Sequence, residues 1–238
     1  MIGIGSLINM AAIVVGGTIG LLFRKGMSER FQDIIIKSIA LCIVFVGAAG
    51  AFEKMLVIRE GSLQSQGTMM VISSFAAGSL VGELINLDQK FTDFGRWLQE
   101  KTGSTGDAAF VRAFVTASLT VCIGAMAIVG SIQEGTTGDY STLATKAILD
   151  FLIILIMASS LGKGCIFSAI PVGVLQLSVT WLAHFLARFL TQPSLDALSL
   201  VGSMLIFCVG VNLIKEHTFK VANMLPTVIV AMIWGLLV

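Results

Sequence analysis

Of the 238 residues in this chain, 56% are hydrophobic and only 12% are charged, and the mean hydropathy is +0.95. Soluble domains carry roughly one charged residue in four, so this composition excludes an ordinary soluble protein. The formal net charge of +1 offers no basic surface for nucleic acid, and the four cysteines lack the CxxC spacing of a zinc site. We therefore expect the lipid bilayer as the surroundings of the chain, with no nucleic-acid partner, no metal and no cofactor.

Apolar stretches of about 20 residues, the length that a helix needs to cross a membrane, recur along the chain. They predict a single transmembrane domain over residues 1–238, an all-α polytopic bundle of about eight spans. In chain order the predicted spans are Ile2–Phe23, Ile34–Phe52, Thr68–Ile85, Ala108–Ile132, Leu143–Leu161, Cys165–Leu190, Leu195–Ile214 and Val221–Val238.

Residues 87–101, between the third and fourth predicted spans, form a shorter amphipathic segment. Leu87, Phe91, Phe94 and Leu98 share one helical face, while the charged side chains fall mostly elsewhere. Two placements fit this pattern: an interfacial helix along the cytoplasmic surface of the membrane, or a loop helix packed on the bundle.

The Lys and Arg residues near the span ends are distributed unevenly. With eight spans, nine of them lie in loops on one side of the membrane and four on the other. Because positively charged loops are retained in the cytoplasm, we expect both termini to lie outside the cytoplasm.

The second and seventh predicted spans can be aligned with one another, and so can the third and eighth. Asp33 then matches Asp196, Gly47 matches Gly210, and Gly82 matches Gly235. The alignment predicts inverted three-helix repeats, residues 1–86 and 165–238, around central helices 108–161, as in many secondary transporters. Apolar segments also match one another by chance, so both interpretations stay open.

Polar residues within or beside the predicted spans are the candidates for a substrate or ion pathway. Asn9, in a stripe of small residues, either bonds across a helix contact or lines the pathway. Asp150 either forms a structural ion pair with Lys146 or carries a coupling proton or cation. We expect Gln133 and the neighbouring Glu134 at the outer boundary, in water. The full set of pathway candidates is Asn9, Gln133, Asp150, Gln176, Asn212 and Asn223.

Pro171 and Pro226 interrupt the sixth and eighth predicted spans. A proline within a helix frees the carbonyl of the residue four positions earlier. Such a carbonyl either accepts a hydrogen bond from a nearby side chain at a simple helix kink or contributes to a polar pocket.

Several strings of the sequence are characteristic when they occur together. They include Phe114–Leu119 (FVTASL), Gly124–Gly135 (GAMAIVGSIQEG), Thr145–Asp150 (TKAILD), Phe167–Pro171 (FSAIP) and Val221–Pro226 (VANMLP). With them the chain resembles a family of small bacterial inner-membrane proteins catalogued as a domain of unknown function. The resemblance implies a multi-pass protein of the bacterial cytoplasmic (inner) membrane, of a kind sometimes described as a transporter. It supplies no substrate and no site residues.

The sequence contains no Walker loop, HExxH pair or nucleophile elbow, so we do not expect an enzyme. We expect a small secondary transporter or permease for a small neutral, zwitterionic or monovalent solute. The alternatives are a non-transporting membrane scaffold or regulatory partner that docks through residues 87–101, and a channel. Glycine-lined helix faces fit contacts within one subunit or between the subunits of a homo-oligomer.

Overall fold

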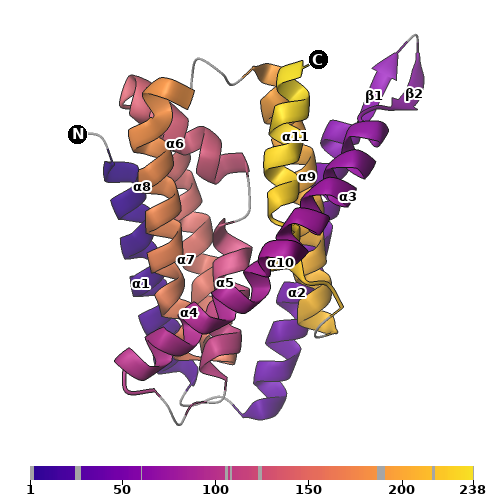
Figure 1. Cartoon of the computed structure of the whole chain (residues 1–238). Helices are drawn as coiled ribbons and strands as arrows, with labels where there is room; N and C mark the ends of the chain where they lie inside the picture. The colour runs from indigo at the N-terminus through magenta and orange to yellow at the C-terminus, as the bar shows by residue number, and fades with distance from the viewer. Residues whose placement is uncertain are drawn as a thin grey trace. The chain divides into compact units, whose positions relative to one another are not determined.

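The computed structural model describes residues 3–24, 28–59, 61–104, 107, 109–122, 125–186, 191–215 and 218–237 (Figure 1). The chain divides into two compact units, which are described separately. The first unit comprises Met1–Ile39, Gln89–Cys122 and Met126–Arg188, and the second comprises Ala40–Asp88, Ile123–Ala125 and Phe189–Val238. The long helix α2 (Glu29–Met55) contributes to both.

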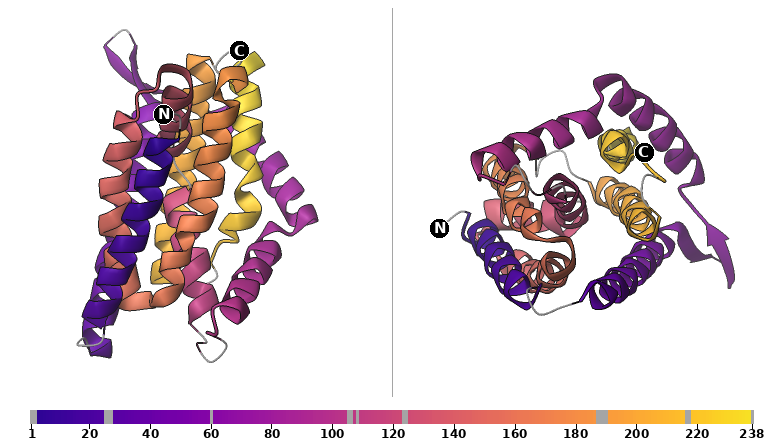
Figure 2. Two further views of the ribbon diagram at one scale, coloured as in Figure 1. Left: turned by 90° about the vertical axis from the view of Figure 1, so that its left-hand side faces the viewer. Right: turned by 90° about the horizontal axis from the view of Figure 1, so that it is seen from below.

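Helices make up nearly all of the first unit. They are α1 (Ile4–Arg24), α4 (Leu87–Lys101, from Gln89 on), α5 (Phe110–Cys122), α6 (Ala125–Thr137), α7 (Ser141–Leu161), the 3₁₀-helix η1 (Lys163–Ser168) and α8 (Ala169–Leu186). α1 and α7 lie side by side along most of their length (Figure 2). A Cβ atom at Gly16 would lie 2.5 Å from the carbonyl oxygen of Phe151, and one at Gly20 would lie 2.2 Å from that of Leu155. From Gly16 to Gly20 the contact on α7 also advances by four residues, from Phe151 to Leu155, so the two helices run parallel. They approach closely at the glycines of α1.

The second unit is built around α9 (Gln192–Ile214). The other helices are α3 (Thr68–Ile85), α10 (Val221–Met224) and α11 (Pro226–Leu237), together with the part of α2 from Ala40. Apolar side chains of α3, α9 and α11 form its core, among them Val71, Val201 and Ala231. The hydroxyl of Thr191 caps the start of α9 by accepting a hydrogen bond from the backbone N–H of Ser194, and Pro193 lies in the first turn.

A short antiparallel hairpin of β1 (Leu56–Arg59) and β2 (Ser62–Ser65) follows α2. These are the only strands in the described residues, and the all-α prediction did not include them. Gly61 in the turn has φ 75°, the left-handed conformation that tight hairpins require. The other regular elements of the described chain are helices, as predicted.

In the described ranges, five helical segments are long and apolar enough to cross a membrane: Ile4–Arg24, Thr68–Ile85, Ser141–Leu161, Lys163–Leu182 and Gln192–Ile214. A sixth results if Phe110–Cys122 and Met126–Gly135, whose axes differ by 73°, form one broken span. These segments cover six of the predicted spans. The predicted span Ile34–Phe52 lies within α2, and the last one is a shorter apolar stretch, Val221–Leu237, divided between α10 and α11.

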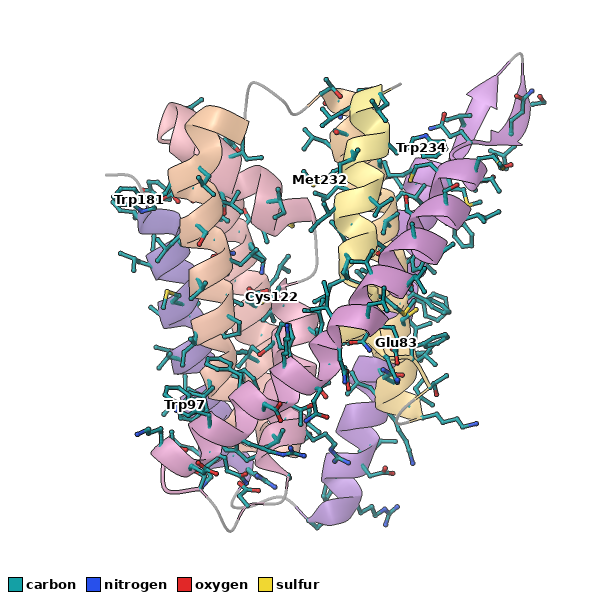
Figure 3. All side chains as sticks on the ribbon, viewed as in Figure 1. Glu83, Trp97, Cys122, Trp181, Met232 and Trp234 are labelled. Atoms are coloured by element: carbon teal, nitrogen blue, oxygen red, sulfur yellow. The ribbon has the colours of Figure 1, made fainter. Side chains whose placement is uncertain are left out.

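The outward faces of these helices are apolar. Ile148 and Val174 are largely exposed, and Trp181 points outward in the last turns of α8 (Figure 3). Exposed apolar faces, with a tryptophan near a helix end, are typical of helices surrounded by lipid. The fold is therefore that of a multi-pass helical membrane protein.

The amphipathic segment forms one helix, α4, with the predicted bounds. Leu98 and Gly95 are buried on its inner face, and the ring of Phe94 makes an edge contact with that of Phe114 on α5. The helix thus packs on the first unit, while Trp97 remains half exposed.

The close approach of α1 and α7 predicts an unequal response to two Gly→Ala substitutions. Gly20→Ala places a methyl group against the backbone of Leu155 and should cost about 1–3 kcal/mol. Gly202→Ala, in α9, meets no atom within 4 Å and should be neutral or stabilising because alanine favours the helix. Thermal unfolding of the purified full-length variants in detergent measures both; equal melting temperatures would contradict the packing of α1 on α7.

Candidate functional site

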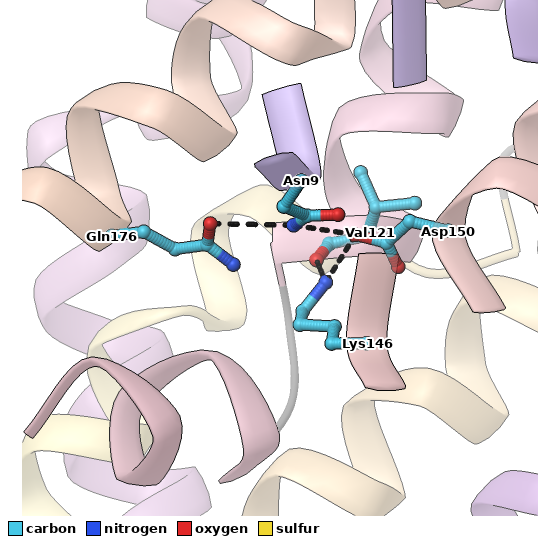
Figure 4. A network of polar contacts seen from close by, with 5 residues as sticks. All are labelled: Asn9, Val121, Lys146, Asp150 and Gln176. Atoms are coloured by element: carbon cyan, nitrogen blue, oxygen red, sulfur yellow. Dashed lines mark hydrogen bonds and ion pairs between the residues drawn. The ribbon is translucent and has the colours of Figure 1, made fainter. Parts of the chain in front are cut away.

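Four polar side chains meet inside the first unit, and we call them the polar cluster: Asn9 of α1, Lys146 and Asp150 of α7, and Gln176 of α8 (Figure 4). The Nδ2 of Asn9 donates to Oδ2 of Asp150 at 3.0 Å and to Oε1 of Gln176 at 3.3 Å. Asn9 and Gln176 are fully buried, and Lys146 and Asp150 are 6% and 4% exposed. The cluster thus contains three of the predicted pathway candidates, Asn9, Asp150 and Gln176, together with Lys146, the predicted ion-pair partner of Asp150.

The packing of α1 between α7 and α8 positions this cluster. Lys146 and Asp150 lie one helical turn apart on the same face of α7. On the other side, a Cβ atom at Gly173 of α8 would lie 2.3 Å from the sulfur of Met10, so the missing side chain admits α1. Close packing on both sides brings Asn9 within reach of α7 and α8 at once.

Lys146 connects the cluster to the end of a broken helix. Its Nζ forms a short ion pair with Oδ2 of Asp150 and donates to the carbonyl oxygen of Val121 at 2.9 Å. Val121 lies in the last turn of α5, where carbonyls lack partners within the helix and favour a positive charge. The ammonium group is thus held by a carboxylate and by the free end of α5, next to the change of direction between α5 and α6.

Several buried polar atoms of the first unit have no hydrogen-bond partner within the described part of the chain. In the cluster these are Oδ1 of Asn9 and Nε2 of Gln176. Around it in the unit are Oε2 of Glu134 and the hydroxyl oxygens of Ser6, Ser118, Ser131, Ser160 and Thr180. An unpartnered buried polar group costs about 1–3 kcal/mol, so such a set is typical of an interior that receives water or a polar solute. Chemically, the cluster offers an acceptor, a donor, a carboxylate and an ammonium group.

Gln133 is placed at the connection between α6 and α7. Its Nε2 donates to Oδ2 of Asp139 at 2.7 Å, and its Oε1 accepts from the hydroxyl of Thr142. The pKa of Asp139 is lowered, chiefly by the hydrogen bond from the backbone N–H of Ser141. Gln133 therefore links two helix ends and is not part of the polar cluster.

Glu134 corrects one prediction. We expected this carboxylate in water at the outer boundary, but it is fully buried. Its Oε1 accepts a hydrogen bond from the backbone N–H of Gly5 at 2.6 Å. The prediction was wrong because a polar residue at the end of an apolar run indicates an interface by default, and nothing in the sequence reveals that α1 covers it.

Asn212 and Asn223 lie in the second unit. Asn212 exchanges two hydrogen bonds with the backbone of Phe219 and closes the loop after α9. Asn223 accepts from the backbone N–H of Asp88 and donates to Oε2 of Glu83, both at 2.6 Å. Glu83, labelled in Figure 3, also pairs with Lys220, and this hydrogen bond raises the pKa of the lysine. These contacts, all inside the second unit, join α3 and Asp88 to α10.

The two prolines occupy different positions. Pro171 lies in the first turn of α8, directly after η1, where the missing N–H needs no partner. Pro226 begins α11 and separates it from α10. Pro226 thus marks a break inside the last predicted span, whereas Pro171 starts a helix. In the described part of the chain, no three His, Cys, Asp or Glu residues are grouped to hold a metal ion.

The buried ion pair predicts strongly non-additive stability changes. Asp150→Asn leaves the buried ammonium group of Lys146 without its carboxylate, and Lys146→Met leaves the buried carboxylate of Asp150 without its ammonium group. Each substitution alone should lower the free energy of unfolding by about 3–5 kcal/mol. The double variant should cost less than the sum of the two, because no buried charge remains. The free energies of unfolding of wild type, the two single variants and the double variant, measured on the full-length proteins in detergent, form a double-mutant cycle that tests this prediction.

A matched control for this cycle is Asp33→Asn. Asp33 forms an ion pair with Lys37 at 2.7 Å, also four residues apart but largely exposed. Its loss should change stability by at most about 1 kcal/mol. Additive losses at Lys146 and Asp150 would show that the two charges do not interact.

Comparison with known proteins gives relatives that cover nearly the whole chain. The chain is 26% identical over 226 residues to the uncharacterized membrane protein YdfK of Bacillus subtilis (strain 168), and the match covers 95% of this chain and 93% of that protein. It is 28% identical over 236 residues to the uncharacterized protein YqgA of Escherichia coli (strain K12), covering 96% and 94%. No solved structure matches the chain. The profile described as "Protein of unknown function (DUF554)" matches residues 4–236, so the resemblance predicted from the sequence is confirmed and the chain belongs to this family.

Proposed function

We propose that the protein is a small secondary transporter of the bacterial cytoplasmic membrane and that the polar cluster lies on its solute or ion pathway. The observation that carries the proposal is the buried pair of Lys146 and Asp150, held between membrane-spanning helices and bonded to the free end of α5. Charged residues inside membrane spans are costly and typically mark substrate or ion pathways.

The chemistry of the cluster favours a small neutral, zwitterionic or monovalent solute. The ammonium group of Lys146 complements a carboxylate or a carbonyl, and the carboxylate of Asp150 complements an amine or a cation. The unpartnered Oδ1 of Asn9 and Nε2 of Gln176 add one acceptor and one donor. Discontinuous helices such as α5 and α6 are a common device for binding solutes at membrane depth.

The contact between α2 and α9, inside the second unit, supports inverted repeats. A Cβ atom at Gly47 would lie 2.4 Å from the backbone nitrogen of Phe207, and one at Gly210 would lie 2.8 Å from that of Val44. The repeat alignment matches Gly47 with Gly210 and Val44 with Phe207. Each contact is therefore the counterpart of the other, and the two helices run in opposite directions, as a pseudo-twofold axis in the membrane plane requires.

From these repeats we propose eight spans, with α2 and the α10–α11 pair included, and both termini outside the cytoplasm. Alkaline phosphatase fused after Val238 should then be active, and the same enzyme fused after Lys101 should be inactive. The expected activities follow from the excess of Lys and Arg in the loops on the side of Lys101. Cysteine-accessibility mapping that places Gly47 and Gly210 in spans of the same direction would contradict the repeats.

Transport is tested by currents from proteoliposomes on a solid-supported membrane, with ions and small metabolites as the panel. Wild type should give a saturable current with at least one of them. Asp150→Asn should reduce that current at least about tenfold, because the neutral amide removes the buried charge. Asp33→Asn, which neutralises an exposed carboxylate of the same unit, should leave it unchanged.

Three results would contradict parts of this proposal. Silence across the panel from folded wild-type protein would favour the scaffold or regulatory partner, with the half-exposed Trp97 on α4 as its docking surface. A current that does not saturate would favour a channel. A saturable current that survives in Asp150→Asn would keep transport and make the ion pair structural.

A further inference from the structure

The first unit contains a buried carboxylate besides that of Asp150: Glu134 of α6, which is not part of the polar cluster. It is fully buried, and among the described residues only one of its oxygens has a partner, the backbone N–H of Gly5 at 2.6 Å. Within the described part of the chain Glu134 forms no ion pair. The start of α1 supplies about half a positive charge, which leaves much of the carboxylate charge uncompensated in a buried place.

Two buried serines are close to this carboxylate along their helices. Ser131 precedes Glu134 by one turn on the same face of α6, and Ser6 follows Gly5, whose N–H binds Glu134. Both are fully buried, and neither hydroxyl has a hydrogen-bond partner among the residues that the structure describes.

The hydroxyls of Ser6 and Ser131 differ from several others in the helices of this protein. In the membrane-spanning helices serine and threonine hydroxyls commonly donate to the carbonyl four residues earlier. Thr18 and Thr120 do so, at 2.7 and 2.8 Å. Among the described residues the hydroxyls of Ser6 and Ser131 have no hydrogen-bond partner, so their lone pairs and that of Oε2 of Glu134 are available to a ligand from outside the chain.

We propose that Glu134, Ser131 and Ser6 bind a sodium ion. One carboxylate oxygen and two hydroxyl oxygens form a set of hard oxygen ligands with a single negative charge, which matches a monovalent cation. The direct carboxylate ligand gives a strong local field, which favours the smaller sodium over potassium. A proton would satisfy Oε2 alone and would leave both hydroxyls without a function.

The inference goes beyond the proposed function, because it concerns other residues and is tested by binding. The full-length protein in detergent is melted over a series of sodium chloride concentrations, with choline chloride keeping the ionic strength constant. Sodium should raise the melting temperature saturably, as a ligand of the folded state does, and potassium should do so more weakly. Radioactive sodium in equilibrium dialysis should bind at one ion per chain.

The variants separate the site from general salt effects. Glu134→Gln should weaken sodium binding at least about tenfold by removing the charged ligand, and Ser131→Ala should weaken it about threefold by removing one neutral ligand. Glu53→Gln, the same substitution at an exposed carboxylate, should bind like wild type. If Glu134→Gln does not fold, Ser131→Ala still provides the comparison.

The proposal is overturned if sodium and choline give the same melting temperatures and no radioactive sodium binds. It is also overturned if Glu134→Gln and Ser131→Ala retain wild-type affinity, or if potassium binds as tightly as sodium. Transport can fail in the panel of metabolites while sodium still binds, so the two proposals fail independently.

Discussion

The ion pair between Lys146 and Asp150 sets the conditions that the rest of the first unit must meet. Two charges inside a membrane bundle persist only when each is hydrogen-bonded and shielded from lipid. α1 supplies the amide of Asn9, α5 supplies the carbonyl of Val121, and α8 supplies Gln176 behind Asn9. Those groups reach the pair only because glycines on α1 and α8 let the helices approach closely. The glycine-rich face of α1 thus permits the close packing on α7 that the cluster requires.

Stability alone does not explain why such a pair is kept. Buried ion pairs can often be replaced by apolar residues of similar volume without loss of stability. A purely structural cluster would also be expected to satisfy all its polar atoms. Here Oδ1 of Asn9 and Nε2 of Gln176 are buried and unpartnered, and Lys146 is bonded to the end of a helix that changes direction. This combination favours a binding role over a structural one.

The sequence predicted the helices well because a bilayer imposes a strict length and polarity on each span. The pairing of Lys146 with Asp150 also followed from the sequence, since residues four apart share a helical face. The contact of Asn9 with Gln176 and the bond from Gly5 to Glu134 join residues 167 and 129 positions apart. No periodicity encodes such contacts, because they depend on which helices become neighbours. For the same reason Glu134 was assigned to water, and the hairpin after α2 was missed.

The two candidate sites of the first unit share one helix, and this has a thermodynamic consequence. Gly5 binds Glu134 and Ser6 belongs to the proposed sodium site, and Asn9, about one turn further along α1, binds Asp150. An ion that fixes the start of α1 against α6 therefore also restricts the position of Asn9. If sodium binding changes the affinity of the polar cluster for its solute, the solute must change the affinity for sodium by the same factor. A shared rigid helix is thus the simplest physical connection by which an ion gradient could drive solute movement in this fold.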